Sequence, residues 1–141
     1  MVSRSGVQLL QLPVQLQEIR LGRPVDLLLD AKAWRVLGFV VRCGDESLRF
    51  LAYAAAEPRE DEIAVPSALL LLEDVEFYRK RARSLRALLG TTVASEGRDV
   101  GSLDDLVVGR DGKVESLLVE QDGTVRMVEA AGARIGLAPA A

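Results

Sequence analysis

The chain repeats its own pattern of glycine, aspartate and apolar residues, and this repeat restricts the fold more than any other feature. A shift of 79 places brings Gly22 onto Gly101 and Asp26 onto Asp105, together with the apolar runs that follow each aspartate. Beyond the next turn the shift becomes 78, and the returning apolar runs of the two copies coincide. A hairpin loop tolerates such a change of one residue. The pattern therefore predicts an internal duplication.

The apolar runs within each copy are short and are bounded by turn residues, which is typical of β-strands. In the first copy, Val25–Asp30 and Val36–Arg42 flank a short hairpin. In the second copy, Leu106–Val108 and Leu117–Val119 flank the dipeptide Asp111-Gly112. Glycine at this place accepts the positive φ that a tight hairpin needs. We therefore expect an all-β fold.

The segment between the copies, residues 74–87, differs from both, because acidic residues come first and basic residues follow. This order suits a helix dipole, and Asp74 is the expected N-cap. We predict one or two helical turns near Asp74–Arg83. The expected organisation is a first unit at residues 1–73, a helical connector at 74–87 and a second unit at 88–141.

The second copy resembles the PRC-barrel superfamily of small β-barrels in the pattern Leu89-Gly90-Thr-Thr-Val93, then Gly101, then Asp105-Leu-Val-Val. The first copy departs from it, with Gln11 where the second copy has Gly90. The resemblance implies two tandem small PRC-barrel-like β-barrels packed together and joined by a short helix. It also implies a role in docking onto another macromolecule, with no active-site residues to carry over.

The composition argues against an enzyme. The chain has no histidine, and Cys43 is its single cysteine, so the usual general base and the usual metal cages are missing. We expect no catalytic residue, no cofactor and no metal. Asp104, Asp105 and Asp111 are interpreted as solvated or turn-capping carboxylates, because neighbouring strand residues point to opposite faces.

The candidate partner-binding residues are mostly basic and lie in the connector. They are Tyr78, Arg79, Lys80, Arg81, Arg83 and Arg86, with Trp34 in the first copy. On a continuous helix, Arg79, Arg83 and Arg86 would share one face and could clamp phosphates or carboxylates. The alternative is that these cations complement the helix dipole. Trp34 is either an exposed interface anchor or a side chain folded back over the barrel end.

These observations favour a non-enzymatic protein-interaction or adaptor module in the cytoplasm, with an unidentified protein partner and a possible homodimer. A ribosome- or RNA-associated maturation factor is an alternative, but the net charge of −3 disfavours it. A second alternative is an accessory protein of a membrane electron-transport complex. We expect no membrane insertion, because no apolar run approaches the roughly 20 residues that a spanning helix needs.

Overall fold

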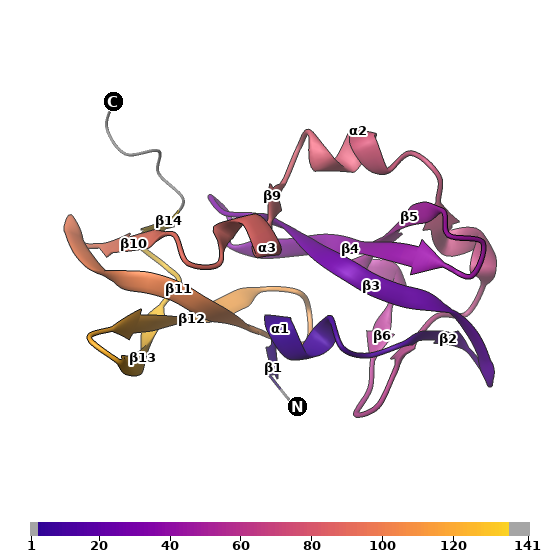
Figure 1. Ribbon diagram of the computed structural model, residues 1–141, viewed down its shortest axis with the longest axis horizontal. Helices are drawn as coiled ribbons and strands as arrows, with labels where there is room; N and C mark the ends of the chain where they lie inside the picture. Colours follow the sequence, from indigo (N-terminus) through magenta and orange to yellow (C-terminus); the bar gives the residue numbers. More distant parts are fainter. Residues whose placement is uncertain (1–2, 136–141) are drawn as a thin grey trace.

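The computed structural model describes residues 3–135 and consists mostly of β-strands arranged in two sheets, which confirms the all-β class (Figure 1). The first sheet contains β2 (Val14–Leu16), β3 (Ile19–Asp30), β4 (Arg35–Cys43), β5 (Leu48–Ala52), β6 (Glu57–Pro58), β7 (Ile63–Ala64), β8 (Leu71–Leu72) and β9 (Arg83–Ser84). The second contains β1 (Arg4–Ser5), β10 (Thr92–Ser95), β11 (Arg98–Val108), β12 (Val114–Gln121), β13 (Thr124–Glu129) and β14 (Ala133–Ile135). The short helices are α1 (Gly6–Leu9), α2 (Val75–Arg79) and α3 (Leu85–Leu88), with 3-10 turns at Tyr53–Ala55 and Ala68–Leu70.

The two sheets reproduce each other's register, irregularities included. The β3–β4 pairing shifts between Pro24 and Asp26, and the β11–β12 pairing shifts at the equivalent place, between Leu103 and Asp105. A second irregularity recurs four residues later in both pairs. We call residues 4–52 the first repeat and residues 83–129 the second repeat.

In each repeat, two backbone segments approach each other closely, and this explains the glycines that match between the copies. A Cβ on Gly22 would lie 2.4 Å from the carbonyl oxygen of Arg42, and one on Gly101 would lie 2.3 Å from that of Glu120. Neither site admits a side chain, since real Cβ atoms essentially never come so close to another heavy atom. The matched glycines in the sequence therefore mark a close approach of two backbone segments that both repeats share.

Each repeat gives its first strand and helix to the sheet of the other repeat. β1 pairs with β11, and β9 pairs with β3. Ser5 caps α1 and donates a hydrogen bond to Asp105, while Ser84 caps α3 and donates one to Asp26. Figure 1 shows the result, with α1 below the centre of the molecule and α3 above it. We call this reciprocal exchange of a strand and a helix between the repeats the clasp.

The two repeats are related by a pseudo-two-fold axis, and their two central hairpins meet at this axis. The Val36 N–H donates to the Gly112 carbonyl at 2.8 Å, and the equivalent Val114 N–H donates to the Trp34 carbonyl at 2.8 Å. A single hydrophobic core runs through both repeats, and it includes fully buried residues such as Phe39. The repeats therefore stabilise each other through shared core and shared backbone hydrogen bonds.

The connector helix begins where the sequence predicts, with the Phe77 N–H donating to the Asp74 carboxylate at 3.1 Å. It ends at Arg79, because the chain then becomes extended in β9 and Ser84 caps a new helix. Arg79, Arg83 and Arg86 consequently belong to α2, β9 and α3. The shared face that a continuous helix would give these arginines is therefore absent, since no continuous helix carries them.

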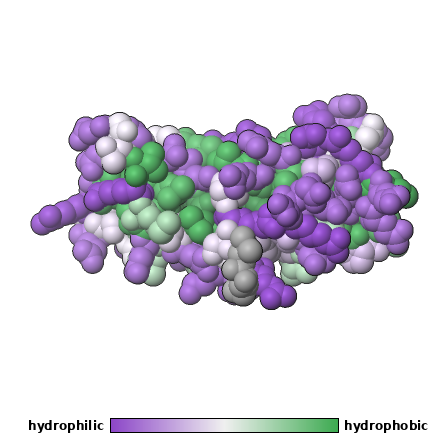
Figure 2. Space-filling view, turned by 90° about the horizontal axis from the view of Figure 1, so that it is seen from below, coloured by the Kyte–Doolittle hydropathy of each residue, from purple (hydrophilic) through white to green (hydrophobic). Residues whose placement is uncertain are grey.

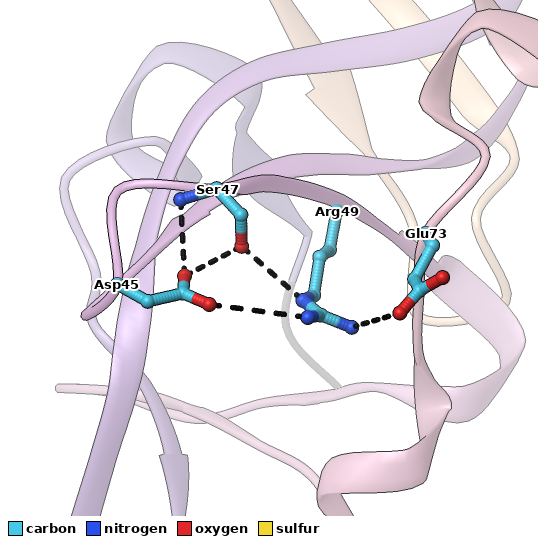
Figure 3. Close-up of polar contacts among 4 residues, drawn as sticks. All are labelled: Asp45, Ser47, Arg49 and Glu73. Carbon is cyan, nitrogen blue, oxygen red and sulfur yellow. Dashed lines mark hydrogen bonds and ion pairs between the residues drawn. The ribbon is translucent and has the colours of Figure 1, made fainter.

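Helix α2 covers one face of the sheet in the first repeat. Val75 from α2 packs with Leu28, Val40 and Phe50 in a second, smaller hydrophobic cluster. An exposed polar network leads the chain into this position (Figure 3).

In that network the Arg49 guanidinium lies 3.6 Å from the Glu73 carboxylate and 4.0 Å from that of Asp45. The Ser47 hydroxyl donates to Asp45 at 2.5 Å and accepts from Arg49 at 3.3 Å. The hydrogen bonds from Ser47 lower the pKa of Asp45. The network ties the start of the α2 segment to β5.

Candidate interaction surfaces

The exposed bases around α2 are partly engaged within the protein. Arg79 forms an ion pair with Glu76 at 2.9 Å. The Arg81 guanidinium lies 3.7 Å from the centre of the Phe77 ring, and it donates to the Phe77 carbonyl at 2.7 Å. Lys80 is exposed. The structure brings these bases together on one short helical turn, where two of them stabilise the turn itself.

Tyr78 and Arg86 have structural partners as well. The Tyr78 ring stacks on Phe50 with centroids 3.8 Å apart and planes at 8°, and the edge of Phe77 lies 5.1 Å away. The Arg86 Nε donates to the Val25 carbonyl, and its backbone N–H donates to Asp26 at 3.2 Å. Tyr78 thus fixes α2 on β5, and Arg86 fixes α3 on β3.

Trp34 folds back between the repeats, which is the second of the two orientations considered for it. Its side chain is buried, and its indole N–H donates to the Ala133 carbonyl at 3.2 Å. Its φ of 52° lies in the left-handed region, and the equivalent residue of the second repeat is Gly112, with φ of 91°. The indole lines an open cavity beside the central hairpins.

The carboxylates near β11 do not form a cation site. Asp105 is buried and accepts from Ser5 and from the Val7 N–H at 2.9 Å, so it fixes the start of α1. Asp111 accepts the Lys113 N–H at 3.1 Å within the hairpin, and this bond lowers its pKa. Within residues 3–135, no group of three or more histidine, cysteine, aspartate or glutamate side chains is placed to hold a metal ion.

The second repeat has an exposed apolar surface that the sequence analysis did not single out. We call it the outer face, and it consists of the exposed Val125 and Met127 with the half-buried Val107 and Leu118. The strand registers make these residues equivalent to Leu28, Val40, Leu48 and Phe50 of the first repeat. Phe50 is 2% exposed, whereas Met127 is 65% and Val125 is 48% exposed. Among residues 3–135, no helix covers this face as α2 covers the first.

Acidic residues surround the outer face. Asp104, Glu115 and Glu129 occupy the positions of Val25, Leu37 and Ala52, three apolar residues that pack at the margin of the α2 cluster. Glu120 occupies the position of Arg42. Figure 2, which views the molecule from below Figure 1, shows hydrophobic side chains gathered in its left-hand half, with hydrophilic ones around them. The outer face is therefore an apolar strip with a negative margin.

Comparison with known proteins adds no relationship, since no protein-family model and no curated protein matches this chain. Within the described residues, no helix is both long and apolar enough to cross a bilayer.

Proposed function

We propose that the protein is a non-enzymatic interaction module that docks a basic amphipathic helix of a partner protein on the outer face of the second repeat. The observation that carries the proposal is the difference between two equivalent sheet faces. One is closed by α2, and the other leaves Met127 65% exposed. An unpartnered apolar strip on a sheet otherwise well packed is typical of a docking site.

The first repeat provides the precedent for a helical occupant. A single short helix covers the equivalent face of the first repeat with two inward side chains, Val75 and Tyr78. These residues are three apart, so they lie on the same side of the helix. Within α2 the exposed charges are Glu76 and Arg79, which pair with each other, and Lys80 and Arg81 follow at its C-terminal end. A short amphipathic helix followed by basic residues therefore already packs on this type of surface within the protein.

Charge supports the basic character of the partner. The carboxylates of Asp104, Glu115, Glu120 and Glu129 replace residues that are neutral or basic in the first repeat. A basic helix would place cations against this margin while its apolar side covers Leu118 and Met127. An acidic helix would meet like charges and would be rejected. The same carboxylates disfavour RNA on this face.

The expected PRC-barrel relationship is part of this proposal, because its implied role in macromolecular docking agrees with a face left open in one of two matched repeats. A cytoplasmic setting is also part of it, in keeping with the single free thiol of Cys43.

The test is a binding titration followed by fluorescence anisotropy. The probe is a labelled helical peptide of about 14 residues built from leucine and lysine, long enough to form a helix on a surface. A leucine–glutamate peptide of equal length is the control for charge. We expect saturable binding of the lysine peptide only, and loss of this binding in Met127→Glu. The matched variant is Leu69→Glu, which changes an 87% exposed leucine outside the outer face.

Equal binding of both peptides, or equal loss of binding in the two variants, would contradict the proposal. Labelled single-stranded RNA is a further arm. Binding of RNA that is lost in Lys80→Glu would support the ribosome- or RNA-associated alternative instead.

A further inference from the structure

A cavity between the two repeats lies apart from the outer face and has the opposite charge. Its volume is about 630 Å³, and it opens beside the hairpin that carries Trp34. It is formed by the β3–β4 turn, by β9, by the start of β12 and by the segment around β14. The size falls within the range of small-molecule sites, which is roughly 300–1,000 Å³.

Cations dominate the polar lining of this cavity. Lys32, Arg83, Lys113 and Arg134 line it, and no aspartate or glutamate stands among the described residues that do so. This composition is notable in a chain whose net charge is −3. Four cations around one open space produce a positive potential that is relieved by bound anions.

The lysines and Arg134 are not engaged in close ion pairs with described neighbours. Within residues 3–135, Lys32, Lys113 and Arg134 form no ion pair. Asp30 and Asp111 attract Lys32 and Lys113 electrostatically, but their carboxylates accept backbone N–H groups, from Lys32 and Ala33 at 2.8 and 3.0 Å and from Lys113 at 3.1 Å. Neither aspartate lines the cavity. The side-chain charges of the lysines and Arg134 are therefore available to a ligand.

The remaining lining is apolar. Trp34, Val114 and Ile135 contribute to it, and the indole N–H is already bound to the Ala133 carbonyl. On the opposite side of the pseudo-two-fold axis the ring of Tyr53 lies against Gly112, whereas the residues equivalent to this pair are Ala130 and Trp34.

We infer that this cavity binds a small organic anion that carries at least two negative charges, as a polycarboxylate or a phosphate ester. The cations recognise its charged groups, and the floor around Trp34 accepts its carbon skeleton. Lysine ammonium groups bind carboxylate and phosphate alike as point charges, so the shared feature is multiple negative charge. This inference is independent of the proposed docking of a helix on the outer face.

Trp34 provides a direct readout, because it is the only tryptophan of the chain and it lines the cavity. The intact protein is titrated with sodium citrate or with sodium pyrophosphate while Trp34 fluorescence is followed. Sodium chloride at matched ionic strength corrects for screening. The two probes distinguish carboxylate from phosphate recognition. We expect a saturable change with at least one probe and a dissociation constant of about 0.1–1 mM.

The test variant is Lys32→Glu/Lys113→Glu, and its control, Lys80→Glu/Arg110→Glu, makes the same change in net charge outside the cavity. We expect the test variant to weaken binding by about tenfold or more, since two attractions become repulsions, and the control by no more than about twofold. Lys32 and Lys113 are exposed, and a Lys32→Ala variant with milder effect repeats the test.

Three results would overturn the inference. They are the absence of a saturable change with either probe, unchanged affinity in the Lys32→Glu/Lys113→Glu variant, and equal weakening in the control variant.

Discussion

Removal of the Asp105 carboxylate tests the reciprocal clasp between the repeats. Asp105 is 9% exposed and joins the repeats through two hydrogen bonds, from the Ser5 hydroxyl and from the Val7 N–H at 2.9 Å. A hydrogen bond to a charged group contributes about 1.5–3 kcal/mol. Asp105→Ala should therefore lower the free energy of unfolding by about 3–5 kcal/mol, and Asp105→Asn, which keeps one acceptor oxygen, by about 1–2 kcal/mol.

The assay is urea unfolding followed by circular dichroism, with the slope of the transition checked for constancy. Asp104→Ala is the matched control, because its exposed neighbouring carboxylate should change stability by less than about 0.5 kcal/mol. Asp26→Ala should repeat the Asp105 result, since Asp26 accepts the equivalent bonds from Ser84 and from the Arg86 N–H. A loss below about 1 kcal/mol in Asp105→Ala would refute the reasoning.

Three further predictions concern single positions. Gly22→Ala should cost more than about 2 kcal/mol of stability in urea unfolding, because its Cβ would meet the Arg42 carbonyl at 2.4 Å, whereas Gly44→Ala, which has open space, should be neutral within about 0.5 kcal/mol. Equal stabilities of these two variants would contradict the close approach. Trp34→Gly should relieve the positive φ, worth about 1–2 kcal/mol, but should still lower the melting temperature, because truncation of a buried tryptophan costs about 3–5 kcal/mol. Burial raises the pKa of the Cys43 thiol, so its alkylation by iodoacetamide should reach half its maximal rate at a higher pH than that of free cysteine, about 8.5. Unfolding in urea should remove this difference, and an unshifted profile in the folded protein would show that the thiol is not protected.

Local signals in the sequence predicted much of the fold. The repeated glycines marked the two places where backbone segments approach closely, because no other residue fits there. Asp74 marked the start of α2, because an aspartate side chain accepts the free N–H groups of a first helical turn. Such signals depend on residues close in sequence and on the backbone that they require.

The exchange of β1 and β9 between the repeats could not be predicted in this way. Ser5 and Asp105 are far apart in sequence, and nothing local indicates which sheet an isolated two-residue strand will join. The same limit applies to the shared face that a continuous helix would give Arg79, Arg83 and Arg86. Ser84 was available as a helix cap, but its pairing with Asp26 across the repeats decides that the chain restarts there.

The outer face was hidden for a related reason. Comparison of the two repeats in the sequence aligned their central strands. In β13, however, the offset between equivalent residues becomes 77, and only the strand register shows that Met127 is equivalent to Phe50. With that register, the substitution of Val25, Leu37 and Ala52 by acids becomes visible. The cavity beside Trp34 likewise depends on four elements that meet only in the folded protein.

The most direct test of the docking proposal uses the methyl group of Met127. The chain has two methionines, Met1 and Met127, so selective ¹³C-methyl labelling gives a spectrum in which the Met127 signal can be assigned with a Met127→Leu variant. The account predicts that a helical leucine–lysine peptide moves this signal saturably, and that a leucine–glutamate peptide does not. An unmoved Met127 signal, or equal shifts with both peptides, would contradict the assignment of the outer face as the docking site for a basic helix.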